Sequence, residues 1–151
     1  MTATQQPDPF GAPPPRAKGP SGPRAGFWKR AWAILLDGLI IVVVAQLLRG
    51  IDRELADFLV LPGGLVYFAL LEGGTRGQTL GKRVFGIRVI DLARGGPIGT
   101  GRGFIRNIVR LLSWMAFGLG YLWMLWDREK QTWHDKAAGT VVVPFDSYPV
   151  G

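Results

Sequence analysis

The chain contains no cysteine and only one histidine, His134. Disulfide frameworks and cysteine-based zinc, haem and iron–sulfur sites are therefore excluded, and we expect no metal and no cofactor. His134 is followed by Asp135, a pair that occurs in catalytic sites. The chain offers no Ser or Cys nucleophile motif to match that pair, so we expect no enzymatic activity and interpret the two residues as a hydrogen-bonded cap of the C-terminal turn.

Acidic residues are also scarce, because 11 Asp and Glu stand against 18 Lys and Arg and give a formal net charge of +7. Apolar residues make up 48% of the chain, which also has six tryptophans. A basic protein can be a nucleic-acid binder, but here Lys and Arg mostly flank apolar runs instead of lining one soluble helix. This pattern predicts a membrane protein with basic flanks and no nucleic-acid partner.

Residues 1–25 are rich in proline, glycine and small polar residues, which predicts a disordered tail. The tail lacks the apolar core and cleavage site of a secretory signal, so we expect it to be retained. A spacer is the simplest role for it. The alternative is a soluble partner of SH3 or WW type that binds residues 13–16 as an extended polyproline helix. Residues 145–151 are interpreted as a second, C-terminal tail.

Three apolar runs follow the first tail, over residues 31–48, 55–71 and 108–126. The first would rise about 27 Å as a helix, close to the hydrocarbon thickness of a bilayer. The second contains Pro62-Gly63-Gly64, which predicts a kink and, less strongly, a broken span of the kind that binds cations. The fold class expected is an all-α integral membrane protein with about three transmembrane helices and a short β-prone cytoplasmic loop.

The loop has two short segments with strand character, at 84–92 and 140–143. These segments could pair only if both lie on the same side of the membrane, which would require the run 108–126 to be re-entrant. We favour three simple crossings and leave the re-entrant alternative open.

Basic residues are distributed unevenly around the runs: five in 1–30, two in 49–54 and seven in 72–107. Positively charged segments stay in the cytoplasm, so the N-terminus and the middle loop are expected there. Lys82, Arg83 and Arg88 of this loop are expected to face the bilayer and to bind anionic headgroups.

Asp37 lies within the first run, and a carboxylate there costs roughly 2.5 to 3.5 kcal/mol on insertion scales. It should therefore face the protein interior and have a cationic partner. Arg106 and Arg110, one turn apart at the start of the third run, are the first candidates, followed by Lys82 and Arg83. Arg30 lies seven residues before Asp37, on nearly the same helical face. Asp37 could exchange a proton during transport or form a structural ion pair, and both readings stay open.

Three segments together resemble the RDD family of bacterial membrane proteins: Phe27 to Asp37 with its Trp-Lys-Arg start, Gly77 to Val89 with Gly-Gln-Thr-Leu-Gly-Lys-Arg, and His134 to Val143. The resemblance covers about residues 26–144, which we treat as one transmembrane domain. It implies that the family's namesake arginine and two aspartates are Arg30, Asp37 and Asp135. It also implies a multi-pass protein of the bacterial inner membrane, with cation/proton antiport suggested for some members. The proline-rich front end is similar to that of actinobacterial members.

Two functions are therefore expected. The first is transport of an ion or small solute by cation/proton exchange. Three helices alone make a poor conduit, so the transport function implies a homo-oligomer. Gly118 and Gly120 would allow close helix packing in that oligomer. The second is a non-transporting membrane adaptor or assembly factor that binds a soluble partner or anionic lipid.

Overall fold

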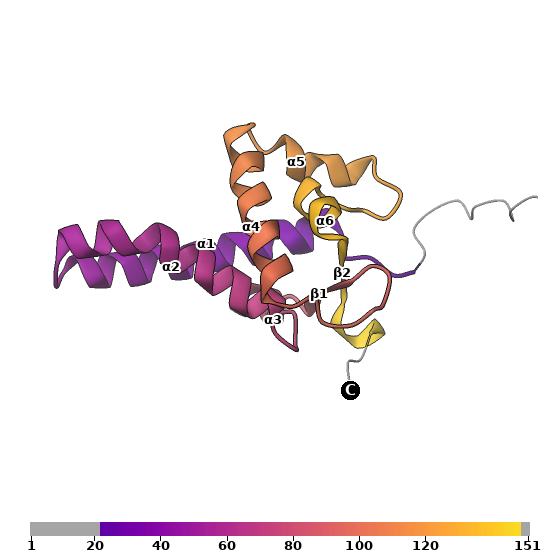
Figure 1. Cartoon of the computed structure of the whole chain (residues 1–151), viewed down its shortest axis with the longest axis horizontal. Coiled ribbons are helices and arrows are strands. Elements are labelled where there is room, and N and C mark those ends of the chain that lie inside the picture. Colours follow the sequence, from indigo (N-terminus) through magenta and orange to yellow (C-terminus); the bar gives the residue numbers. More distant parts are fainter. Residues whose placement is uncertain (1–21, 149–151) are drawn as a thin grey trace, which may run out of the picture.

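The computed structural model describes residues 22–148 of the chain. Its longest elements are two helices, α1 (Phe27–Arg49) and α2 (Arg53–Gly73), which form an antiparallel hairpin that projects away from all other elements (Figure 1). The predictions for residues 1–21, including the tail's disorder and its soluble partner, lie outside the described residues, as do residues 149–151.

Both hairpin helices are long and apolar enough to cross a membrane, and they contain the runs predicted at 31–48 and 55–71. The Asp52 side chain caps α2 by accepting a hydrogen bond from Leu55 N at 3.0 Å. α2 continues through Pro62 without interruption. The 23 residues of α1 rise about 35 Å, which exceeds the thickness of a bilayer core.

The third apolar run is not a straight helix, so the prediction of a simple span over 108–126 is wrong. α4 (Thr100–Met115) is followed by α5 (Leu119–Leu122) and a 3-10 turn, and the chain bends by 111° between α4 and this second part. The bend occurs at Phe117 and Gly118, whose φ angles are 54° and 76°. α4 runs across the hairpin and not along it (Figure 1). Among the described residues, two helices are long and apolar enough to span a membrane, or three if the bent pair is counted as one.

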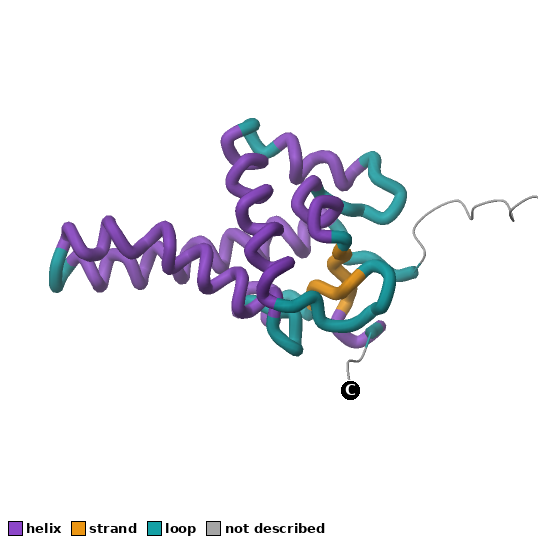
Figure 2. Tube along the Cα trace, viewed as in Figure 1, coloured by secondary structure: helices purple, strands orange, loops and turns teal. Residues whose placement is uncertain are grey.

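The β-prone segments pair, so the fold is mostly helical but not all-α as predicted. β1 (Ile87–Asp91) and β2 (Thr140–Pro144) form a two-stranded antiparallel sheet in which Val89 lies opposite Val142 (Figure 2). Two short helices precede the strands, α3 (Leu80–Val84) and α6 (Trp133–Ala138). The sheet brings together parts of the chain that lie on either side of the bent run.

The interior of this fold is more polar than apolar. Ala33, Ile87, Val89 and Val142 belong to a small apolar cluster against the sheet. Among the described residues, however, 17 buried side chains are polar or charged and 14 are hydrophobic. Large apolar side chains are instead exposed along the hairpin and on α4, as expected where the solvent is lipid. The polar interior is therefore the part of the fold with functional interest.

Candidate functional site

Glu72 is the centre of the buried charges. It lies in the last turn of α2 and its side chain is fully buried. Three cations from two other elements bind its carboxylate. Arg106 Nε donates to Oε2 at 3.0 Å, Arg110 Nη2 donates to Oε1 at 2.6 Å, and Lys82 Nζ of α3 also donates to Oε1. One carboxylate therefore ties α2 to both α3 and α4.

Asp135 is the second buried anion, and it is held from two directions. Arg30 of α1 donates to its Oδ2 at 2.6 Å, and Arg106 Nη1 donates to its Oδ1. Asp135 also completes a capping box with Thr132 at the start of α6. Because Arg106 contacts Glu72 and Asp135 at once, the two anions belong to one network that joins α1, α2, α3, α4 and α6.

Asp37 is not part of that network. Its carboxylate accepts hydrogen bonds from three neutral groups: Thr79 Oγ1 at 2.6 Å, Gly81 N at 2.7 Å and Tyr67 Oη at 2.8 Å. The predicted pairing with Arg106 or Arg110, or with Lys82 or Arg83, is therefore wrong. An ionised carboxylate only accepts hydrogen bonds, so three donors suit it well.

The Gly77–Arg83 segment is a clasp against the hairpin. Gln78 Nε2 donates to Ile87 O at 2.9 Å, and Thr79 caps α3 while it binds Asp37. Gly81 approaches α1 so closely that a Cβ would lie 2.1 Å from Ala33 O. Glycine is therefore required at this position.

The predicted lipid-facing loop needs a correction, since only Arg83 of its three residues is exposed. Lys82 is buried on Glu72. Arg88 is buried too: it donates from Nη1 to Tyr148 O at 3.0 Å and lies over the Phe145 ring at 4.8 Å. Both predictions were wrong because these side chains have interior partners: a carboxylate for Lys82, and a backbone carbonyl and an aromatic ring for Arg88.

Burial and neighbouring charges shift the pKa values of three buried groups outside the hairpin helices: Asp135, Lys82 and His134. Burial alone would raise the pKa of Asp135, but Arg106 and Arg30 outweigh burial and hold that pKa well below its usual value. Burial lowers the pKa of Lys82 to about 8, against the opposing effect of Glu72. Burial likewise lowers the pKa of His134 well below its usual value. His134 is therefore neutral at pH 7.

His134 lies in the first turn of α6 and packs against α5. Its ring centroid lies 4.9 Å from that of Tyr121, and its Nε2 lies 2.9 Å from Thr132 Oγ1. The hydrogen-bonded cap expected at 134–135 is formed by Thr132 and Asp135, while His134 contacts the capping hydroxyl. Among the described residues there is no cluster of three acidic or histidine side chains able to hold a metal.

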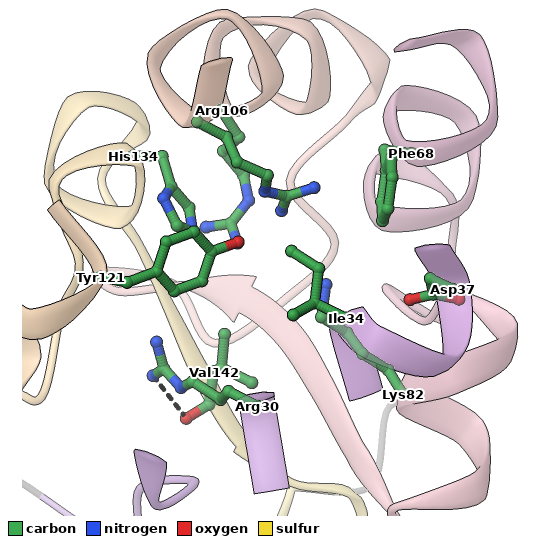
Figure 3. Close-up of a pocket in the computed structure, with 10 residues that line it drawn as sticks. Arg30, Ile34, Asp37, Phe68, Lys82, Arg106, Tyr121, His134 and Val142 are labelled. Carbon is green, nitrogen blue, oxygen red and sulfur yellow. Dashed lines mark hydrogen bonds between the residues drawn. The ribbon is translucent and has the colours of Figure 1, made fainter. Parts of the chain in front are cut away.

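Several network side chains surround a small cavity of about 20 Å³, room for roughly one water molecule. Figure 3 shows this space between Tyr121, His134 and Arg106 on one side and Ile34 of α1 on the other. Lys82, Arg30, Arg110 and Asp37 also line it. The cavity is therefore bounded mainly by cations and hydrogen-bond donors.

Sequence reasoning missed Glu72, the residue on which the network depends. One signal was available: Glu72 is an acidic residue at the end of an apolar run, just before Gly73-Gly74 and with seven basic residues in the following loop. A carboxylate in such a position needs a cationic partner, and the neighbouring sequence supplies several.

Comparison with known proteins gives the family. A model of the RDD family matches residues 24–139, which includes all six charged residues of the network. The chain belongs to the RDD family. It is 37% identical over 127 residues to the uncharacterised protein YckC of Bacillus subtilis, covering 78% of this chain and 83% of the relative.

Two further proteins are similar to this chain. The uncharacterised membrane protein YteJ of Bacillus subtilis is 32% identical over 136 residues, covering 79% of this chain and 80% of that protein. A proline-rich antigen homolog of Mycobacterium tuberculosis is 35% identical over 94 residues, 60% of this chain, but the match spans only 39% of that relative's length. No solved structure matches the chain.

The three residues expected from the resemblance to be the family's namesake positions have two different roles in the structure. Arg30 and Asp135 bind one another across 105 positions of sequence, whereas Asp37 binds the clasp through neutral groups. The arginine and the second aspartate are network members. The first aspartate fixes the loop that delivers Lys82 to the network.

Replacing Asp135 with Asn should destabilise the protein strongly, because Arg30 and Arg106 would each lose a buried counter-charge. The expected loss is about 3 to 5 kcal/mol in the free energy of unfolding in detergent. Asp57→Asn is the matched control, since Asp57 pairs with Arg49 and both side chains are at least 40% exposed, so its loss should cost about 1 kcal/mol or less. Equal effects of the two substitutions would contradict the network's importance.

The stability of the protein should fall as the pH drops below about 6.5 because of His134 alone. The unfolded chain binds a proton at this histidine near its usual pKa, whereas the folded chain does not until the pH is much lower. The slope should approach about 1.4 kcal/mol per pH unit. Thermal unfolding between pH 7.5 and 5 measures it, and His134→Phe should flatten the curve. A wild-type curve already flat over that range would contradict the neutral, buried histidine.

Proposed function

We propose that this RDD protein is a non-transporting platform on the cytoplasmic face of the bacterial inner membrane, where it crosses the membrane twice and binds anionic lipid. The observation that carries the proposal is the one-sided organisation of the molecule. The charge network and the sheet lie at one end of the molecule, and the apolar hairpin extends from that end as an anchor (Figure 1).

The contacts of β2 support the proposal of two crossings. Val142 lies opposite Val89 of β1, and Val142 O accepts a hydrogen bond from Ala25 N at 2.9 Å. A single crossing between residues 92 and 139 would separate the two strands by the whole bilayer. The N-terminal segment and all elements after α2 therefore share one side in this proposal.

The charges support a cytoplasmic location for that side. Among the described residues, every Lys and Arg lies at the network end of the molecule except Arg49 and Arg53, which flank the hairpin turn. Cytoplasmic segments carry such an excess of positive charge. The turn at Gly50–Asp52 is then external.

α4 and α5 fit an arrangement in the plane of the inner leaflet. α4 buries Arg106, Asn107 and Arg110 against the network, while its opposite face exposes large apolar side chains. The exposed apolar surface of α4 continues at the bend between α4 and α5, where Phe117 is 97% exposed. A helix with one charged and one apolar face lies along a bilayer surface. Trp114, Trp123 and Trp126 are all exposed on this segment, as suits the headgroup layer.

Anionic lipid is the partner with the best support. Lys29, Arg76, Arg83 and Arg94 are exposed at the network end. Each such charge near an anionic surface contributes about 1 kcal/mol to its binding. The predicted soluble partner of the proline-rich segment would add a second contact on the same side.

Cation/proton exchange is the second candidate, favoured by one observation: Asp37 is a buried carboxylate within a spanning helix. Two spanning helices enclose no conduit, so this candidate also needs the predicted homo-oligomer. It is the weaker candidate because three donors already hold Asp37 in place.

Single cysteines test the topology without interference, because the chain has none of its own. In intact cells, an impermeant maleimide should label Ile51→Cys at the hairpin turn but neither Arg94→Cys nor Lys130→Cys. Disruption of the membrane should make the latter two reactive. Labelling of Lys130→Cys in intact cells while Arg94→Cys stays protected would establish a third crossing and contradict the proposal.

Lipid retention and ion flux, measured on the same preparations, test the function. The purified full chain should retain phosphatidylglycerol in preference to phosphatidylcholine. Joint replacement of Arg76 and Arg83 by Gln should weaken that retention roughly 30-fold, since two such charges contribute about 2 kcal/mol. Replacement of Arg49 and Arg53 by Gln removes equal charge at the opposite end and should have a smaller effect.

In proteoliposomes the wild-type chain should give no Na⁺/H⁺ exchange above that of empty vesicles. The measurement contradicts the platform proposal and supports transport if Na⁺/H⁺ exchange is present in the wild type and absent in Asp37→Asn at equal reconstitution. Equal lipid retention by both double variants would also contradict the platform.

A further inference from the structure

We propose that the cavity inside the charge network is a binding site for one small anion of halide size. The site lies between α1, α4, α5 and α6, and the side chains that carry it are Arg30, Arg110, His134 and Tyr121 (Figure 3). It is independent of the platform proposal, since it uses buried groups and not the exposed basic surface.

The first argument is charge. Four cations meet in the network, Arg30, Lys82, Arg106 and Arg110, and its two carboxylates are Glu72 and Asp135. Even when Asp37 is included as a third anion, the buried groups carry one more positive than negative charge. An uncompensated buried charge is costly, and a bound anion removes the excess.

The second argument is a set of unpartnered donors. Arg30 Nε, Arg110 Nε and His134 Nδ1 are buried and have no hydrogen-bond partner, and each belongs to a side chain that lines the cavity. The three side chains are 3% to 6% exposed. Buried donors without partners are rare in folded proteins, and three around one space indicate a missing acceptor.

His134 takes part as a donor. Its neutral ring carries one proton, and its Nε2 lies against Thr132 Oγ1, which already accepts from Asp135 N at 3.4 Å. When the Thr132 hydroxyl donates to Nε2, the ring proton is on Nδ1. The unpartnered nitrogen is then an N–H group, which an anion accepts and a cation repels.

The third argument is size. The cavity volume of about 20 Å³ admits a monatomic ion or one water molecule, and it excludes sulfate and organic carboxylates. Ile34 and Phe68 form its apolar wall, and the Tyr121 hydroxyl points into the space between the surrounding side chains (Figure 3). A weakly hydrated halide suits a wall that combines N–H donors with apolar carbon.

The test uses the purified full chain in chloride-free detergent buffer. The ³⁵Cl NMR linewidth is measured as chloride is added at constant ionic strength with gluconate. Bound chloride should give saturable broadening that bromide reverses and sulfate does not. Tyr121→Phe removes one hydroxyl from the cavity and should raise the chloride Kd roughly tenfold.

Tyr148→Phe is the matched control, because its hydroxyl accepts from Arg24 away from the cavity and its loss should leave the Kd unchanged. His134→Phe is the second variant and should abolish saturable binding while far-UV circular dichroism keeps the wild-type helix content.

Three results would overturn the site. The first is broadening in the wild type that never saturates, and the second is identical displacement by sulfate and bromide. The third is an equal change of Kd in Tyr121→Phe and Tyr148→Phe. In each case the cavity would hold a water molecule instead of an anion.

Discussion

A buried carboxylate at the end of a membrane helix constrains the rest of this fold. Glu72 has no exposed surface, and a charge in that position is stable only when cations surround it. Arg106, Arg110 and Lys82 supply that compensation from two other elements. α4 therefore crosses the hairpin because two of its arginines reach Glu72, and its apolar face is left exposed.

Asp135 extends the same constraint to α1 and α6. Its pairing with Arg30 and Arg106 fixes α6 against α1, and the sheet then closes as Val142 meets Val89. Asp37 contributes indirectly: it binds the clasp, and the clasp contains Lys82, which pairs with Glu72. Pairing of buried charges thus takes the place of a large apolar core, which a membrane protein does not gain from lipid.

The sequence predicted the spanning hairpin well because an apolar run of bilayer length has few alternative structures. The strands at 84–92 and 140–143 were also located, but their pairing was not preferred. The bend at Phe117 and Gly118 was weighed only as an alternative, since an amphipathic run of this length resembles a span. Partners of buried charges were mostly wrong: Asp37 was paired with Arg106 and Glu72 was overlooked, because one-dimensional spacing does not show which of several cations reaches a given carboxylate.

The most direct test of this account is hydrogen–deuterium exchange of the full chain with Glu72 replaced by Gln. The account predicts that amides of α3 and α4 lose protection together, while the hairpin turn near Ile51 is unchanged. Glu54→Gln, at the exposed start of α2, should leave all of these regions as they are in the wild type. Loss of protection confined to the last turn of α2 in Glu72→Gln would contradict a network that holds the elements together.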